Sequence, residues 1–497
     1  MVRCAQMASV CAGCDLVFLE GASIMPFSAA RRQRIGLICF SAIPDDPRVR
    51  RQGDLFHSRG WDVVAVGLPG ARSQQPPWQC LAIDAAVGRA GPAGGGDASA
   101  APEGMIAGAP GDHVEAAAPL RAPDAFDQVL RLLPTRWRPA VRALAGRALR
   151  RTIFPVLRRA VRAKDVARVY VDARHADATY WTLNDRFARL YELASRQQAD
   201  IWLANDWTAL PIVRRLASEQ GVPYAYDTHE LAVDEYAHRL LWRLTQRPVI
   251  AAIEREGIAG SAVTSCVSQG IADRLHELYR LPEKPLLIRN MPHFEIHPYR
   301  PSGEAIRVLY HGVVNVGRGL EACIDSVALW RPEFRLTIRG PGPAEYLEAL
   351  AARIRAAGLG DRIVLAPPVP MIDLVKEAAH FDVGLFALPG HSEQNVHVLP
   401  NKFFEYTMAG LALCVSDLPE MTALLRQHDL GRSIPDVTPQ AIAAAVNGFD
   451  RASIDVYKRR ALEAAKVLNW EAEADRLFAA IGQAVAGAAE ARGFAAQ

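Results

Sequence analysis

The stretch from Leu399 to Ser416 constrains the fold most, because it joins a short amphipathic helix directly to a buried strand. Pro400 is compatible with the first turn of a helix, where its missing N–H costs nothing. Apolar side chains recur at helical spacing within 403–408, and Gly410 can end the helix. The apolar run 411–416 then reads as a buried strand.

The polar residues of this helix indicate a binding site for a nucleotide. Asn401 and Lys402 fall in its first turn, where free backbone N–H groups and the helix dipole favour an anion. Lys402 adds a positive charge for a phosphate, and Glu405 lies on the same face three residues later. A carboxylate there can accept hydrogen bonds from sugar hydroxyls. The sequence therefore predicts half of a nucleotide pocket here.

Residues 34–67 predict the opening of a parallel α/β sheet. A strand at 34–40 is followed by the loop 41–47, by a helix and by a second strand. Loops after the strands of such sheets carry ligands, so Asp45 and Asp46 are expected at the ligand-bearing edge.

Three arginines, Arg48, Arg50 and Arg51, open the helix that follows this loop. We interpret them chiefly as a solvated face, with contact to an anionic acceptor as the alternative.

Two further strands end in polar residues. The strand at 200–207 contains Asp206, and the next, at 221–227, leads into His229 and Glu230. The carboxyl ends of neighbouring parallel strands share an edge, so these side chains are expected close together. A long helix over 238–258 is predicted to follow, then strands at 262–268 and 286–290.

A second α/β unit begins at residue 306 with the apolar run Ile306 to His311. A loop with Gly312, Gly317 and Gly319 follows it, and Arg318 lies between the last two. Glycines let the backbone approach a pyrophosphate closely, and the next helix directs its positive dipole end at the anion. Further strands are expected at 335–340, 362–367 and 383–388.

Several of these segments together resemble glycosyltransferase family 4, the retaining group 1 enzymes with a GT-B fold. They are LPNKFFEYTMAGLALCVSDLPEM, ANDW, YDTHEL, CVSQGIADRLHELY and IRNMP, and the resemblance covers roughly 34–84 and 196–482. It implies an α/β protein with two Rossmann-like domains facing across a cleft. It also implies a C-terminal helix that crosses back to the first domain.

The resemblance implies transfer of a sugar from a nucleotide-diphosphate donor to a polysaccharide, lipid-linked or other glycan acceptor, with retention and without metal. No cofactor is expected beyond the donor itself. The implied catalytic residues are His229, Arg318 and Lys402. The implied donor-binding residues are Gly312, Gly317, Arg318, Gly319, Pro368, Val369, Asn401, Lys402 and Glu405, and the acceptor-side residues are Asp45, Asp46, Asp206 and Glu230.

The sequence departs from the family pattern at two places. Val313 stands where members commonly carry an Arg, and Arg318 stands where a Lys is usual. His397, eight residues before Glu405, stands near the position of a usual first glutamate. Asn395, His397 or nearby backbone would then have to orient the sugar, and a non-catalytic partner subunit stays open as an alternative. A sugar-nucleotide epimerase with the same fold is the other alternative.

The expected organisation follows from shifts in composition. Residues 1–33 are expected to be a disordered extension, 34–290 the acceptor-side domain, 291–304 a linker, 305–468 the donor-binding domain and 469–488 the crossing helix, frayed beyond about 488. Residues 85–123, rich in Ala, Gly and Pro, are expected to be a flexible insertion.

The basic stretch 131–168 alternates arginines with Trp, Phe and Leu. Such helices can lie in an anionic membrane interface, and a pair of surface helices with solvated arginines is the equal alternative. A formal net charge of +3 says nothing about nucleic acid, but the small number of stacking aromatics in this stretch argues against it. Cys39, Cys266 and Cys414 fall in apolar strands, which indicates buried thiols and a cytoplasmic protein, peripheral on the inner face of the membrane if the basic stretch binds there. Cys11 and Cys14 lack partners for a metal site.

Overall fold

The computed structural model describes residues 31–70, 73–83 and 163–495. The expectations for residues 1–30, for the insertion 85–123 and for positions 131–162 of the basic stretch fall outside the described residues, as do Cys11 and Cys14.

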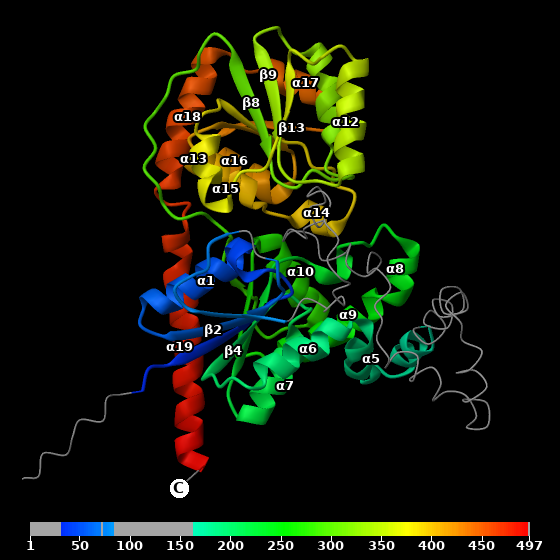
Figure 1. The fold of residues 1–497 in the computed structure, drawn as a ribbon, viewed down its shortest axis with the longest axis vertical. Coiled ribbons are helices and arrows are strands. Elements are labelled where there is room, and N and C mark those ends of the chain that lie inside the picture. The colour runs from blue at the N-terminus through cyan, green and yellow to red at the C-terminus, as the bar shows by residue number, and fades with distance from the viewer. Residues whose placement is uncertain (1–30, 71–72, 84–162, 496–497) are drawn as a thin grey trace, which may run out of the picture. The chain divides into compact units, whose positions relative to one another are not determined.

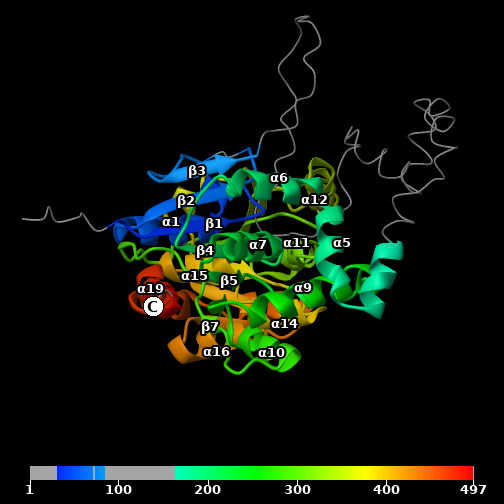
Figure 2. The ribbon, with the colours of Figure 1, turned by 90° about the horizontal axis from the view of Figure 1, so that it is seen from below.

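The first domain is built on a parallel sheet with the strand order β3-β2-β1-β4-β5-β6-β7. These strands cross the view of Figure 2 in that order. The chain adds β2 and β3 on one side of β1 and then places β4 on the other side, so the loops after β1 and β4 are neighbours. The strands are β1 Arg34–Ile38, β2 Asp62–Gly67, β3 Gln79–Ala82, β4 Ile201–Asn205, β5 Tyr224–Thr228, β6 Val263–Cys266 and β7 Leu286–Leu287.

Two apolar layers cover this sheet. One contains α1 (Pro47–Ser58) and the C-terminal helix α19 (Trp470–Ala495). The other contains α5 His175–Leu183, α6 Asp185–Ala194, α7 Leu210–Gln220, α9 Arg247–Ala259 and α10 Gln269–Tyr279. Cys39 and Cys266 are buried in these layers as free thiols, as predicted.

The single long helix predicted over 238–258 is wrong. The structure has two helices, α8 (Leu240–Thr245) and α9 (Arg247–Ala259). Pro248 lacks the N–H that would bond the carbonyl of Leu244, and the Tyr170 hydroxyl donates to that carbonyl instead, at 3.1 Å. The sequence did contain this signal, since a proline ends or interrupts a helical pattern.

The second domain repeats the plan, with the strand order β10-β9-β8-β11-β12-β13 and parallel pairing throughout. Its order reverses between β8 and β11. The strands are β8 Ile306–His311, β9 Phe334–Arg339, β10 Ile363–Ala366, β11 Val383–Phe386, β12 Ala412–Ser416 and β13 Gly431–Ile434. The helices are α11 Leu320–Ser326, α12 Ala344–Ala356, α13 Leu374–Ala378, α14 Glu393–His397, α15 Asn401–Met408, α16 Pro419–His428, α17 Pro439–Asn447 and α18 Arg451–Ala465.

The chain passes between the two domains twice. Residues 288–305 form neither helix nor strand, and the return passage leads from α18 into α19, which runs along the first domain in Figure 1. Trp470 N donates to Pro292 O at 2.8 Å, which ties the two passages together. Helix α19 continues to Ala495 rather than fraying near 488, because alanine favours helix and Arg492 donates to Gly221 O.

In the described part of the chain, helices of sufficient length and apolar character to cross a membrane are absent.

Candidate functional site

Both predicted aspartates of the loop after β1 accept hydrogen bonds from backbone N–H groups. Asp46 caps α1, its Oδ1 accepting from Arg48 N and Val49 N, and it also accepts from the Ser41 hydroxyl. Asp45 accepts from Ser73 N at 2.7 Å. These contacts fix the loop at the point where the strand order reverses.

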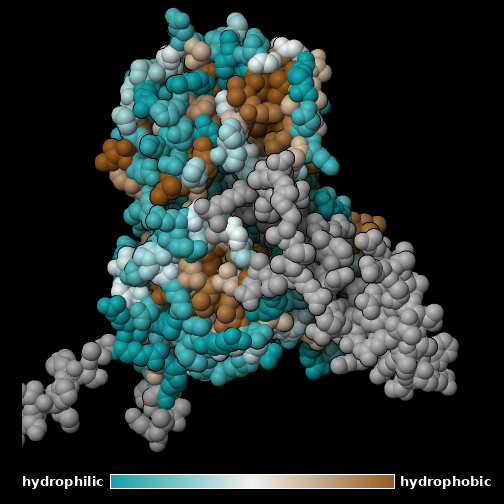
Figure 3. All heavy atoms as spheres, viewed as in Figure 1, coloured by the Kyte–Doolittle hydropathy of each residue, from teal (hydrophilic) through white to brown (hydrophobic). Residues whose placement is uncertain are grey.

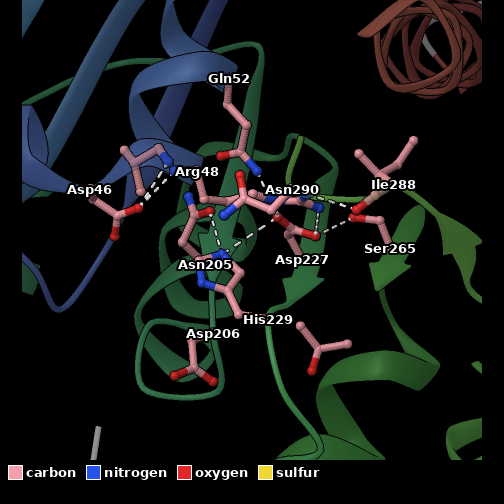
Figure 4. Close-up of polar contacts among 12 residues, drawn as sticks. Asp46, Arg48, Gln52, Asn205, Asp206, Asp227, His229, Ser265, Ile288 and Asn290 are labelled. Carbon is pink, nitrogen blue, oxygen red and sulfur yellow. Dashed lines mark hydrogen bonds and ion pairs between the residues drawn. The ribbon is translucent and has the colours of Figure 1, made fainter. Parts of the chain in front are cut away.

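Arg48 is not part of a solvated face, and that interpretation was wrong for this residue. Its side chain is 2% exposed and grips Asp227, itself fully buried, with Nε–Oδ2 at 2.6 Å and Nη2–Oδ1 at 2.7 Å. Gln52 and Ser265 also donate to Asp227, and Arg48 donates to Ile288 O (Figure 4). Burial would raise the pKa of Asp227, but the charge of Arg48 and the hydrogen bonds hold it well below its usual range.

His229 lies at the edge of this buried network. Its Nε2 is 3.1 Å from Asn205 Oδ1 and 3.5 Å from Asp227 Oδ2 (Figure 4). Both neighbours are acceptors, so Nε2 carries a proton and Nδ1 is the nitrogen left for a ligand. Burial acts to lower the pKa of His229, but the bond and charge of Asp227 raise it overall.

The other acceptor-side carboxylates gather beside His229. Asp206 follows β4 with a left-handed φ of 71°, and burial raises its pKa. Glu230 follows β5, and burial together with the charge of Asp206 raises its pKa to about 7. Glu235, which the sequence reasoning did not single out, has a raised pKa from burial and from the charge of Glu230. This edge of the site thus holds carboxylates that resist ionisation.

Gly312 ends β8 with φ +117°, and a Cβ there would lie 2.4 Å from Lys402 Cε. The glycine therefore makes room for the lysine side chain as well as adopting a conformation that L residues rarely take. Gly340, at the end of β9, packs directly against Gly312, because a Cβ on it would lie 1.8 Å from Gly312 O. Backbones at these two strand ends come unusually close.

Lys402, in the first turn of α15, is a cation without a carboxylate partner. Among the described residues its Nζ has neither an ion pair nor a hydrogen bond, and it lies 5.0 Å from the ring centre of Phe386 and 5.8 Å from that of Tyr310. Burial, and then the charge of Arg318, lower the pKa of Lys402 to about 8, against which Glu405 acts in the opposite direction. Two positive charges held together this way suit an anion.

Glu405 lies one turn after Lys402 and is nearly buried. Its Oε2 is 2.8 Å from Nε2 of His311. His311 lies at the end of β8, and the sequence reasoning missed its role at the site. Burial acts to raise the pKa of Glu405, but the hydrogen bond and charge of His311 lower it overall, with help from Lys402 and Arg51. His311 stacks on Tyr406, with ring centres 4.7 Å apart. The carboxylate is therefore ionised and held in position.

The remaining predicted donor residues lie on three other segments of the second domain. Gly317 and Gly319 both have positive φ, and a Cβ on Gly319 would lie 2.2 Å from Ala387 O, just after β11. Asn401 begins α15. Pro368 and Val369 follow β10, the edge strand of the sheet.

His397 and Asn395 are engaged elsewhere. His397 O accepts from the Ser268 hydroxyl, and a Cβ on Gly270 of the first domain would lie 2.2 Å from His397 Nδ1. Asn395 donates to Pro389 O. Two neighbours of His397 also reach the first domain, since Glu420 accepts from Gly270 N and Gln394 accepts from Leu231 N. In this conformation the segment joins the two domains.

Arg318 connects the two halves of the site. Its positive charge acts against the raised pKa of Glu230 on the first domain and adds to burial in lowering the pKa of Lys402 on the second. Arg51 makes a second link between the domains. It donates a hydrogen bond to Asn290 of the first domain, and the negative charge of Glu405 on the second domain acts to raise the pKa of Arg51. Burial nevertheless lowers the pKa of Arg51 to about 10. The structure thus brings most predicted residues of both domains to one region.

Comparison with known proteins supports this arrangement. Residues 305–449 match the family model described as "Glycosyl transferases group 1". Curated protein sequences provide no match to the chain.

Solved structures share the fold at low identity. The chain is similar to sucrose-phosphate synthase from Thermosynechococcus elongatus, with a TM-score of 0.61, 14% identity and coverage of 92% of this chain and 100% of that one. It is also similar to Anabaena HepE in complex with UDP and glucose, with a TM-score of 0.57, 12% identity and coverage of 91% and 100%.

A third similar structure is an E. coli protein titled "Trehalose-6-phosphate", bound with UDP-2-fluoro glucose. Its TM-score is 0.54, its identity 11% and its coverage 91% and 99%. These likenesses each cover 91% or more of this chain. The chain therefore has the two-domain GT-B fold, and residues 305–449 of its second domain match the group 1 glycosyltransferase model.

Proposed function

We propose that this protein transfers a sugar from a nucleotide-diphosphate sugar, held by the second domain, to an acceptor held by the first. Lys402 is the observation that carries the proposal. This lysine has a pKa lowered by burial and lies near two aromatic rings. Among the described residues its ammonium group has no carboxylate partner. A diphosphate supplies the missing negative charge.

The chemistry asked of the site is separation of negative charge. As the bond between sugar and diphosphate breaks, charge accumulates on the leaving oxygen, and fixed positive groups lower the barrier if they are already oriented. Lys402 and Arg318 are such groups. Three glycines in the loop from Gly312 to Gly319 have positive φ and no side chain, so the loop backbone can approach the diphosphate and donate N–H groups to it.

In this proposal Glu405 binds the ribose of the donor and His229 binds its sugar. Glu405 is ionised and oriented by His311, so it accepts hydrogen bonds from ribose hydroxyls. His229 contacts the transferred sugar through Nδ1, because Nε2 is engaged by Asn205 and Asp227. The carboxylates Asp206 and Glu230 would bind acceptor hydroxyls.

The finer features of the reaction are part of the proposal as well. Retention of configuration follows from the family resemblance. The positive charges of Lys402 and Arg318 allow transfer without a metal ion. HepE was solved with UDP and glucose and the E. coli protein with UDP-2-fluoro glucose, which makes UDP-sugars the leading donors. The acceptor is a polysaccharide, a lipid-linked sugar or another glycan, met in the cytoplasm or at its membrane.

The test is a panel of nucleotide sugars and free nucleoside diphosphates measured by thermal shift. Wild type is compared with the double variant Arg318→Ala and Lys402→Ala, with Lys376→Ala as a control at an exposed lysine of the same domain. A ligand at 100 times its dissociation constant should stabilise wild type by about 2.7 kcal/mol. Equal shifts in the double variant would remove the donor site from this place.

Turnover then separates the alternatives. A transferase releases nucleoside diphosphate slowly from the donor alone and faster with an acceptor. An epimerase instead converts the donor without needing an acceptor. A partner subunit binds the donor and releases nothing, which would refute the catalytic proposal while leaving the site in place.

A further inference from the structure

We propose that α8 and the helical residues 163–171 form a docking face for an anionic lipid bilayer. Five large apolar side chains are exposed there: Tyr170, Val171, Leu240, Leu241 and Leu244. They are called the α8 face below. Apolar atoms reach the surface at the place of α8 in Figure 3.

The five side chains are contiguous. The Tyr170 hydroxyl donates to Leu244 O at 3.1 Å, which joins the two helices. On α8, Leu240, Leu241 and Leu244 are spaced by three and four residues, so they share one side of the helix. Leu241 is 77% exposed and Leu244 51%. An exposed cluster of this kind on one short helix marks an interaction surface.

Helix α8 is held in the domain by a different residue. Trp242 is buried, with its ring centre 5.9 Å from that of Tyr236, and belongs to the apolar layer of the first domain. The helix thus buries its tryptophan and exposes its leucines. Folding of the domain does not require those leucines to be apolar.

The charges around the α8 face select an anionic occupant. Arg239 and Arg243 flank the leucines, both are exposed, and neither makes an ion pair within the described residues. Lys164, Arg168 and Arg174 are exposed on the neighbouring segment, where Asp165 and Asp172 are the only carboxylates paired with them in the described part of the chain. Leucines at acyl depth with arginines at headgroup level fit an anionic bilayer better than a neutral one.

The sequence that leads into this surface has the same character. Residues 131–162 contain ten arginines and no acidic residue. Each basic residue near an anionic membrane contributes about 1 kcal/mol to binding. The α8 face lies close to the acceptor side in the chain, because Leu240 follows Glu230 by ten residues. A membrane bound there would present an acceptor near His229, and this last step alone rests on the proposed function.

The experiment is flotation of the full chain with phosphatidylcholine vesicles, with and without phosphatidylglycerol. Wild type should float only with phosphatidylglycerol, and less as salt increases. Arg239→Gln with Arg243→Gln should weaken binding about thirtyfold, or about fivefold per arginine. Leu241→Asp with Leu244→Asp should weaken it more than about tenfold. Ile372→Asp with Leu329→Asp is the matched control, since these residues are 83% and 50% exposed on the second domain.

A local readout distinguishes the α8 face from the basic sequence before it. Amide deuterium uptake of residues 238–247 should fall when phosphatidylglycerol vesicles are added. Unchanged uptake, or full vesicle binding by the leucine double variant, would overturn the proposal and leave binding to residues 131–162. A dimer that dissociates in that variant would also overturn it, by assigning the face to a second copy. Thermal shift with UDP on the same variants shows that the donor site is intact, so the two proposals fail separately.

Discussion

Each sheet places one cation beside the point where its strand order reverses, and the two cations are treated in opposite ways. Arg48 of the first domain is completely paired, since Asp227 binds two of its nitrogens and Ile288 O a third. Lys402 of the second domain faces two aromatic rings and a second cation. The difference indicates that Arg48 serves the folded chain itself, and it underlies the proposal that Lys402 serves a ligand.

The largest expected effect is at the paired cation. Arg48→Met leaves Asp227 charged and buried without a partner, which should cost about 3–5 kcal/mol of unfolding free energy. Chemical denaturation followed by circular dichroism measures it. Arg50→Met, which breaks a half-buried i,i+4 pair with Asp54 on the same helix, should cost about 0.5 kcal/mol. Similar losses in the two variants would contradict a structural role for Arg48.

Lys402→Met should show the reverse pattern. Removing a desolvated cation beside Arg318 should leave the free energy of unfolding unchanged or higher. UDP affinity should fall by about 1.5–3 kcal/mol, the range for hydrogen bonds to charged groups. Calorimetric titration of Lys402→Met and of the exposed control Lys376→Met makes the comparison. Wild-type affinity in Lys402→Met would show that the two cations do not differ as described.

Gly312→Ala sharpens the comparison by displacing the lysine without removing it. The new methyl group would collide with Lys402 Cε, and the positive φ adds about 1–2 kcal/mol of backbone strain. Gly358→Ala is the control, because its φ is +66° but nothing lies within 4 Å of the added Cβ, and it lies outside the proposed donor site. Only Gly312→Ala should weaken UDP binding, by up to about 2 kcal/mol. In a Lys402→Met background it should weaken UDP binding no further, and an additive loss would refute the link.

The smallest effect concerns pH. The pKa of Lys402 is about 8 in the folded chain against 10.5 for an ordinary lysine. Above about pH 8 the folded chain loses this proton while the unfolded chain keeps it, so stability from this group rises with pH up to about 10.5. A bound diphosphate restores the proton, so UDP affinity should fall up to about tenfold per pH unit above 8. In Lys402→Met the slope should vanish.

The sequence was most informative where local rules apply. Apolar runs separated by glycine and polar loops predicted most strands of both sheets. Strand ends then predicted where Asp206, His229 and Gly312 would lie, because parallel strands place their carboxyl ends on one edge. The first turn of a predicted helix did the same for Lys402. The roles of these residues stay predictions until they are tested.

What the sequence did not predict depends on contacts between distant residues. Arg48 and Asp227 are 179 positions apart, so an arginine in a polar helix turn looked solvated. His311 looked like the end of an apolar strand until α15 brought Glu405 to it. His397 stands near the usual position of a glutamate in the sequence, but in the structure its side chain packs against Gly270 of the other domain.

Helix α19 also has a consequence for the order in which the molecule is made. The core of the second domain draws on a continuous segment from Met291 to Leu468, so it is complete before the last helix leaves the ribosome. One core layer of the first domain needs Trp470, Leu477 and Ile481, nearly two hundred residues after its last strand. Although the first domain is translated earlier, it is therefore the later of the two to close its core, and a chain cut short before α19 would expose that layer.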